Sequence, residues 1–300
     1  MELTFWGIRG SYPIARQDNV KYGGNSTCIH VRTLPGEDWI IDGGSGIRPL
    51  GRSLMRREFG KGGGVARILI GHTHWDHILG FPFFEPFLVE GNKFEIYSAG
   101  QEDADIEEIL AGQQHRVNFP VPFEALKADI RFYTLEPGDS LVFGSTKISV
   151  VQLNHPGITL GYRLQTMGVS GSSLVVYTDT ARIDAVRLGD GMPRDDSFRD
   201  KYKDLLREHA KNADLLVHDA HFNEEEISGK EHWGHSTPAD AVMLAKDAGV
   251  KRLALFHHAP EHNDRMVDEQ VEIGQKLAGD SIEVFGAREG ESIVLRRLGE

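Results

Sequence analysis

The stretch that most constrains this chain is a cluster of metal-capable side chains directly after a predicted strand. Residues 65–70 read Val-Ala-Arg-Ile-Leu-Ile, an apolar run typical of a buried β-strand. Residues 71–77 then read Gly-His-Thr-His-Trp-Asp-His and supply four candidate ligands, namely His72, His74, Asp76 and His77. Polar side chains at the carboxyl end of a buried strand are typical of the functional edge of an α/β sheet.

The spacing of these ligands indicates two metal ions. His72 and His74 alternate along extended backbone and can point to one side, whereas Asp76 and His77 follow a bend and can face a second point. Imidazole and carboxylate ligands without a thiolate suit Zn, Mn or Fe. The alternative, a histidine-rich surface loop that binds no metal, is left open by this segment alone.

The motif His-Thr-His-Trp-Asp-His resembles the H-x-H-x-D-H signature of the metallo-β-lactamase fold. The resemblance extends from Leu3 to Val294 and is strongest to the phosphodiesterase branch. That branch includes ribonuclease Z, the phosphoribosyl 1,2-cyclic phosphodiesterases and cyclic-nucleotide phosphodiesterases. The resemblance implies a single α/β domain over residues 1–300, an αββα sandwich in which two mixed sheets are flanked by helices.

The same resemblance implies further metal ligands at the ends of later strands. His155 follows the predicted strand 147–153 and matches the third histidine of the first metal site. Asp179 follows the predicted strand 173–177 and matches the carboxylate that bridges both ions. Of the pair His257-His258, the first aligns with the last ligand of the second site. The implied set is His72, His74 and His155 on one ion, Asp76, His77 and His257 on the other, and Asp179 between them.

Two residues are candidates for proton transfer. The predicted strand from Asp214 ends in His-Asp-Ala-His-Phe, which resembles the H-[ED]-A-x-F segment of ribonuclease Z-type proteins, whose acid orients a catalytic histidine. Asp219 is that acid here. His235 lies just ahead of a helix that Thr237 and Pro238 are predicted to begin, where phosphate is favoured. We expect His235 to protonate the leaving oxygen or to hold the phosphate; the alternative is a loop histidine without a catalytic role.

Two further histidines are candidates for substrate contact. His115 lies in the predicted loop 112–122, which we expect to cover the site from a partner subunit, although a solvated loop is an equal alternative. His258 either supports its neighbour or lines the substrate pocket. The aromatic segment 81–87 is expected to pack in the core, with a pocket wall as the alternative, and the charged segment 183–200 is expected to be a loop.

Charge and composition limit the partners. The formal net charge is −12 and no Lys- or Arg-rich run is present, so we expect a small anionic substrate and no long nucleic acid. No apolar run approaches the ~20 residues that a membrane span needs, and the N-terminus does not resemble a signal peptide. The single cysteine, Cys28, excludes an internal disulfide. We therefore expect a cytoplasmic protein that does not bind membranes. A homodimer is also expected, in keeping with a loop that covers the site from a partner subunit.

The expected function is that of a metal-dependent hydrolase. The resemblance implies a phosphodiesterase with two divalent ions, for which zinc is preferred over manganese or iron. A hydroxide between the ions is expected to attack phosphorus, and Asp76 is expected to belong to the catalytic group. A small cyclic or nucleotide phosphodiester is the expected substrate. The alternatives are a ribonuclease Z-like tRNA 3′ endonuclease, whose Gly- and basic-rich arm has no counterpart here, and a non-catalytic nucleotide sensor.

Overall fold

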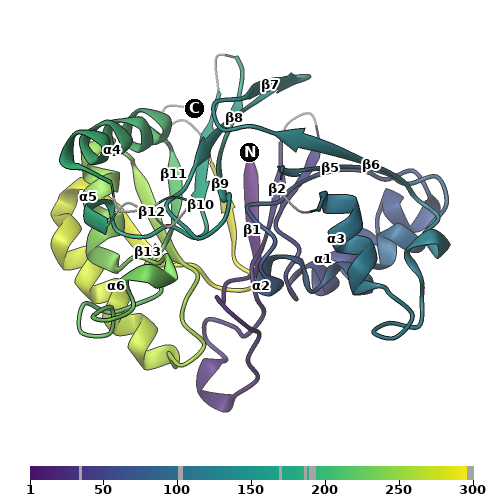
Figure 1. Ribbon diagram of the computed structural model, residues 1–300, viewed down its shortest axis with the longest axis horizontal. Coiled ribbons are helices and arrows are strands. Elements are labelled where there is room, and N and C mark those ends of the chain that lie inside the picture. The colour runs from purple at the N-terminus through teal and green to yellow at the C-terminus, as the bar shows by residue number, and fades with distance from the viewer. Residues whose placement is uncertain (34–35, 101–103, 169–170, 186–187, 189–193, 296–300) are drawn as a thin grey trace.

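The computed structural model describes residues 1–33, 36–100, 104–168, 171–185, 188 and 194–295. Two seven-stranded sheets pack face to face, and helices cover the outer face of each. Helices α4, α5 and α6 lie outside one sheet and α1 and α3 outside the other, as Figure 1 shows. The predicted αββα sandwich with two mixed sheets is confirmed.

The first sheet has the strand order β14-β1-β2-β3-β4-β5-β6. Its strands are β1 (Glu2–Gly7), β2 (Cys28–Arg32), β3 (Asp38–Ile41), β4 (Val65–Leu69), β5 (Lys93–Ala99), β6 (Asp129–Leu135) and β14 (Ser292–Val294). Strands β3 to β6 run parallel to one another, whereas β14, β1, β2 and β3 pair antiparallel. The metal-motif strand β4 is therefore a central parallel strand.

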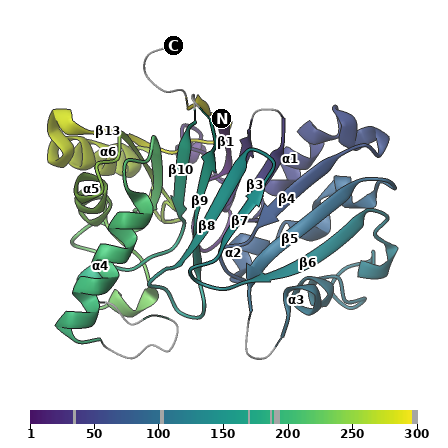
Figure 2. The same cartoon turned by 90° about the horizontal axis from the view of Figure 1, so that it is seen from above.

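The second sheet has the order β13-β12-β11-β10-β9-β8-β7 (Figure 2). Its strands are β7 (Ser140–Phe143), β8 (Thr146–Gln152), β9 (Leu160–Thr166), β10 (Ser173–Tyr177), β11 (Leu215–Asp219), β12 (Arg252–Phe256) and β13 (Glu283–Gly286). Strands β10 to β13 are parallel, and β7 to β10 pair antiparallel.

Side-chain alternation divides the apolar residues of each strand between two cores. Along β10, Leu174 and Val176 pack between the two sheets, whereas Val175 and Tyr177 face the helices. Successive side chains of a strand point to opposite faces of the sheet, so a strand buried on both sides is apolar throughout. In the segment 81–87, Phe81, Phe84 and Phe87 join the core under the first sheet while Phe83 remains exposed.

The helices are α1 (Ile47–Leu54), α2 (Trp75–Ile78), α3 (Ile106–Gln113), α4 (Asp196–Ala210), α5 (Pro238–Asp247) and α6 (Asp264–Ala278). None of them, among the described residues, could span a bilayer. The expected loop 183–200 was partly wrong, because α4 begins at Asp196 with Asp195 accepting a hydrogen bond from the amide of Phe198. Within that segment, residues 186–187 and 189–193 lie outside the described residues.

The carboxyl ends of six strands place polar side chains at one edge of the sandwich. Because parallel strands end at the same edge of a sheet, residues far apart in sequence meet there. The side chains are Asp42 after β3, His72 after β4, His155 after β8, Asp179 after β10, Asp219 at the end of β11 and His257 after β12.

Candidate metal centre

The first group of potential ligands consists of His72, His74 and His155, whose ligand atoms all lie within 4.8 Å of one another. Nε2 of His155 is 3.2 Å from Nδ1 of His74. The backbone of His74 is extended and α2 begins at the next residue, so the predicted bend after His74 is confirmed. Nδ1–H of His155 donates to the carbonyl of Gly234 at 2.9 Å, which turns Nε2 toward the group.

The second group consists of Asp76, His77, Asp179 and His257, again within 4.8 Å of one another. The two oxygens of Asp179 point to different histidines, since Oδ2 lies 3.1 Å from Nε2 of His77 and Oδ1 lies 3.1 Å from Nε2 of His257. Oδ2 of Asp76 also lies 3.1 Å from Nε2 of His257. Rings of the two groups touch, because the centroids of His72 and His77 are 4.2 Å apart.

These residues fit divalent metal ions. Both ring nitrogens of His72, Nε2 of His77 and Oδ2 of Asp179 are buried without a hydrogen-bond partner in the described part of the chain. Nε2 of His77 and Oδ2 of Asp179 are close in space yet are not aligned for a hydrogen bond with each other. Buried polar atoms are costly when unpartnered, and imidazole with carboxylate is the donor set of zinc sites.

A carboxylate beneath the second group orients one ligand. Oδ2 of Asp42 accepts from Nδ1–H of His77 at 2.8 Å, and Oδ1 accepts from the amide of Gly71 at 2.7 Å. The remaining nitrogen of His77 is thereby directed at Asp179. Asp42 and His257 both have positive φ, near 60°, a conformation that costs energy for residues other than glycine and that gathers at functional sites.

The electrostatics differ between the two groups. Burial lowers the pKa of His72 well below its ordinary value and brings the pKa of His155 to about 4. Burial opposes the charge of Asp179, but His257 and His77 hold the pKa of this carboxyl well below its usual range. Burial also opposes the charge of His77, yet Asp179 and the neighbouring carboxylates raise its pKa. The first group is therefore neutral imidazole, ready to bind a cation. In the second group two carboxylates face His77 and His257, whose pKa values are both raised, so a cation that binds there takes the place of imidazole protons.

His235 lies beside both groups and is held by Asp219. Nδ1–H of His235 donates to Oδ2 of Asp219 at 2.7 Å, and the ring is 5.3 Å from that of His155 and 5.1 Å from that of His257. Oδ1 of Asp219 accepts from the amide of His221 at 2.9 Å. The predicted cap is confirmed as well: Thr237 and Asp240 form a capping box at the start of α5.

The sequence did not indicate the place of His221. This ring is buried, stacks on His235 with centroids 4.4 Å apart, and its Nδ1–H donates to the carbonyl of His257 at 2.8 Å. His221 thus connects the end of β11 to the end of β12. Its position two residues after Asp219 was the only signal in the sequence.

Two predicted substrate residues do not join these groups. His258 is fully buried with its ring 5.6 Å from that of Tyr22, and burial lowers its pKa well below the ordinary value. His115 is exposed and its Nδ1 accepts from the amide of Val117. The expected loop from residue 112 starts later than predicted, because α3 continues to Gln113. Contact of His115 or His258 with a substrate stays a prediction.

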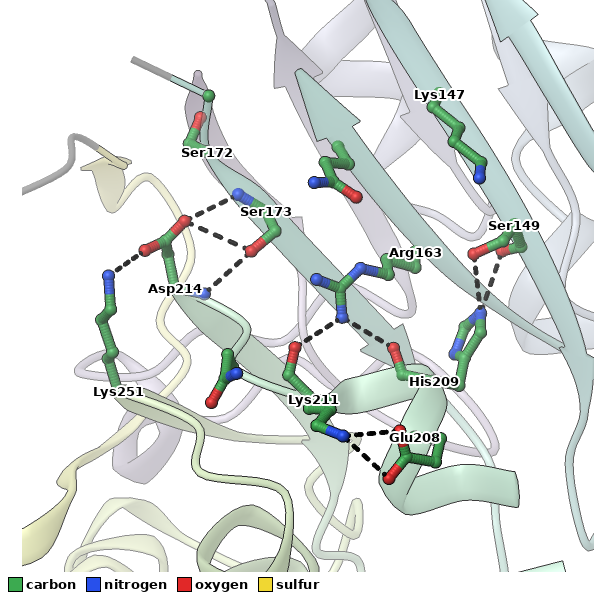
Figure 3. Close-up of a pocket in the computed structure, with 13 residues that line it drawn as sticks. Lys147, Ser149, Arg163, Ser172, Ser173, Glu208, His209, Lys211, Asp214 and Lys251 are labelled. Carbon is green, nitrogen blue, oxygen red and sulfur yellow. Dashed lines mark hydrogen bonds and ion pairs between the residues drawn. The ribbon is translucent and has the colours of Figure 1, made fainter. Parts of the chain in front are cut away.

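A separate cavity of about 670 Å³ lies at the opposite end of the second sheet, where β10 begins and α4 ends (Figure 3). Two of its lysines are paired within the chain, Lys251 with Asp214 at 2.6 Å and Lys211 with Glu208 at 2.8 Å. Arg163 donates to the carbonyls of His209 and Lys211 at the end of α4. These cations therefore stabilise the chain itself, and the metal ligands lie elsewhere.

Curated relatives of this chain are ribonucleases Z. The ribonuclease Z of Lactobacillus johnsonii is 25% identical over 315 residues, an alignment that covers 95% of this chain and 94% of the relative. Among solved structures, the short form of human tRNase Z matches with a TM-score of 0.64 at 20% identity and covers 98% of this chain and 99% of its own. A diphosphatase from the PhnP family matches with a TM-score of 0.61 at 17% identity and covers 98% and 97%.

These relatives correct one expectation. Long nucleic acid was excluded as a partner, and that exclusion is wrong, because the curated relatives that span the chain are ribonucleases Z and a structural neighbour is a tRNase Z. The exclusion relied on the net charge of −12, a sum over the whole chain. Net charge does not describe the potential at one site, where bound cations dominate. The expected homodimer is not shown.

The family follows from a match over most of the chain. The model of the beta-lactamase superfamily domain matches residues 40–258, a range that contains every residue of the two ligand groups. The hydrolase class and a dependence on divalent metal, both expected from the motif, agree with this match. The chain belongs to the metallo-β-lactamase superfamily.

Proposed function

We propose that this protein is a phosphodiesterase with two divalent ions, zinc in the first instance, that hydrolyses a small cyclic or nucleotide phosphodiester. The observation that carries the proposal is the pair of adjacent ligand groups, buried except for His74, with the Asp219–His235 pair beside them. Asp179 would help to hold both ions, because its oxygens lie 3.1 Å from nitrogens of His77 and His257 in the second group and its charge also acts on His72 of the first group.

The ions would supply a water of lowered pKa as nucleophile and would accept charge from a phosphoryl oxygen. His235 is the proposed proton donor to the leaving oxygen. Because Nδ1–H is held by Asp219, Nε2 is the nitrogen from which a proton passes to the leaving oxygen as its bond to phosphorus breaks. Asp219 stabilises the imidazolium form that this step requires, and the stack on His221 fixes the ring plane.

The proposal is tested with metal-reconstituted protein and bis(p-nitrophenyl) phosphate. We expect release of p-nitrophenolate that a chelator abolishes. For a 2′,3′-cyclic nucleotide, whose leaving alkoxide needs a proton, His235→Ala should lower kcat by roughly 10²- to 10⁴-fold, the usual contribution of a general acid. The metal content measured by elemental analysis should be unchanged, and turnover of bis(p-nitrophenyl) phosphate should fall much less, because p-nitrophenolate leaves without a proton. Loss of metal from His235→Ala would make His235 a ligand and would contradict its proposed role.

A second candidate is tRNA 3′ processing, which the ribonuclease Z relatives favour. At 25% identity these relatives do not assign the substrate. A precursor tRNA with a 3′ trailer, incubated beside the small phosphodiesters, separates the two candidates. Cleavage of the tRNA alone selects the endonuclease. Two bound ions without turnover of any phosphodiester would contradict the enzyme and restore the nucleotide sensor.

A further inference from the structure

Two of the four tryptophans in this chain are exposed, and both border the metal centre. Trp75 is 68% exposed and Trp233 is 50% exposed, whereas Trp39 is fully buried in the core. One exposed aromatic side chain is ordinary for a folded protein, but exposed aromatics gathered at a site mark a binding surface.

A single imidazole connects the neighbours of the two tryptophans. Trp75 directly follows His74, whose Nδ1 lies 3.2 Å from Nε2 of His155. The other nitrogen of His155 donates at 2.9 Å to the carbonyl of Gly234, which directly follows Trp233. Because His74 is itself exposed, the centre is open to solvent where Trp75 stands.

The indole of Trp233 is held in place relative to His235. The ring of Phe222 lies 6.1 Å from Trp233 and 5.9 Å from His235, so one aromatic side chain packs against both. Nζ of Lys230 lies 4.6 Å from the centre of the Phe222 ring and 5.6 Å from that of Trp233. A positive charge and an ordered aromatic face thus stand beside the catalytic histidine.

We propose that Trp75 and Trp233 bind the aromatic base of a nucleotide whose phosphate lies at the metal centre. This inference rests on the proposed phosphodiesterase function and names its substrate class, a phosphodiester that carries a nucleobase. Aromatic side chains stack on any base, because every base has a π face. Lys230 adds attraction for the negative charge of the same nucleotide.

A nucleobase suits this surface better than a protein partner does. A protein or a second copy of the chain seated on both tryptophans would cover His74 and close the centre to substrate. A planar ring attached to the reacting phosphate occupies the same surface while the phosphate reaches the ions.

The test compares two esters that share one leaving group. Thymidine 5′-(p-nitrophenyl phosphate) carries a base and methyl p-nitrophenyl phosphate does not. We expect Trp75→Ala and Trp233→Ala to raise KM for the thymidine ester on the order of tenfold. The kcat for the thymidine ester, the kinetics with the methyl ester and the metal content should all be unchanged. Trp75→Phe should restore most of the affinity. Phe198→Ala, which removes an exposed ring on α4, is the matched control. Equal losses on both esters, or no loss on either, would overturn the proposal.

A binding measurement tests this inference separately from the proposed function. If the wild-type protein cleaves neither ester, the proposed phosphodiesterase activity is contradicted, and tryptophan fluorescence then tests whether the base site exists. Thymidine 5′-monophosphate should quench the metal-loaded protein at lower concentration than it quenches Trp75→Ala, and ribose 5-phosphate should quench neither. Tighter binding of a short oligoribonucleotide than of the mononucleotide would place an RNA end on the tryptophans. Equal binding of both monophosphates, or conversion of a dimer to a monomer by the alanine variants, would overturn the base site.

Discussion

At the scale of single residues, two fully buried carboxylates position histidines of the candidate centre. Asp219 accepts from His235 and from backbone amides, and Asp42 accepts from His77 and Gly71. Each fixes the tautomer of a histidine, so that Nε2 faces the site. In the proposed mechanism the two acids would act on different steps, Asp219 on proton transfer and Asp42 on metal binding.

Asp219→Asn should lower kcat about 100-fold or more with both ions retained. The amide cannot stabilise the charged form of His235, and it donates where the carboxylate accepted. Steady-state kinetics with elemental analysis is the measurement. Unaltered kcat would show that His235 works without Asp219.

Asp42→Asn should weaken metal binding by about 10- to 100-fold, the usual effect of removing the partner of a metal-bound histidine. Asp38→Asn is the matched control. Asp38 is a buried carboxylate paired with Arg57 at the other end of β3, so its loss costs stability and leaves metal affinity unchanged. Competition with a chromogenic chelator measures both. Equal metal affinities in the two variants would show that Asp42 does not support metal binding.

At the scale of elements, one glycine joins the metal ligands to the segment before α5. Gly234 has φ of 87°, and a Cβ there would lie 2.4 Å from Nδ1 of His155. The same residue separates Trp233 from His235. The path of this short segment therefore sets the positions of a ligand, an acid and an indole together.

Gly234→Ala should displace His155 and reduce metal occupancy and turnover on the order of tenfold or more. Gly229→Ala is a close control, because Gly229 also has positive φ, 81°, but its Cβ would meet nothing within 4 Å. The control therefore carries the backbone strain of about 1 kcal/mol without the clash. Similar metal contents for the two variants, measured by elemental analysis, would contradict the role of the glycine.

The sequence predicted the strands that carry ligands better than it predicted the surface around them. The candidate ligands follow short apolar runs such as 65–70 and 173–177, and such runs predict buried strands. The start of α4 was missed because its first turn is charged and mostly exposed, so no apolar periodicity marks it. The stack of His221 on His235 joins the end of β11 to the segment before α5, and no local sequence pattern predicts such a contact.

At the scale of the whole molecule, the largely buried His209 makes stability depend on pH away from the candidate metal centre. Nε2–H of His209 donates to the carbonyl of Ser149 at 3.1 Å and Nδ1 accepts from the hydroxyl of Tyr177 at 2.8 Å, so the ring is neutral. Burial lowers its pKa to about 4. Between this value and ~6.5 the unfolded chain binds a proton that the folded chain does not, so stability falls as pH falls.

Because of His209, the free energy of unfolding of the metal-free protein should fall by about 2–3 kcal/mol between pH 6.5 and 4. His209→Gln should flatten that part of the profile, although it lowers stability at pH 7 by removing one of the two hydrogen bonds. Urea unfolding across this range is the measurement. Parallel profiles of the two proteins would contradict the account.

The most direct test of the dinuclear centre is elemental analysis of protein purified without chelators and supplied with zinc or manganese. The wild-type chain should hold two divalent ions, and His72→Ala, which removes a ligand of the first group only, should hold one. A wild-type chain without bound metal, or a variant that keeps the wild-type content, would contradict the assignment of these two groups as a metal centre.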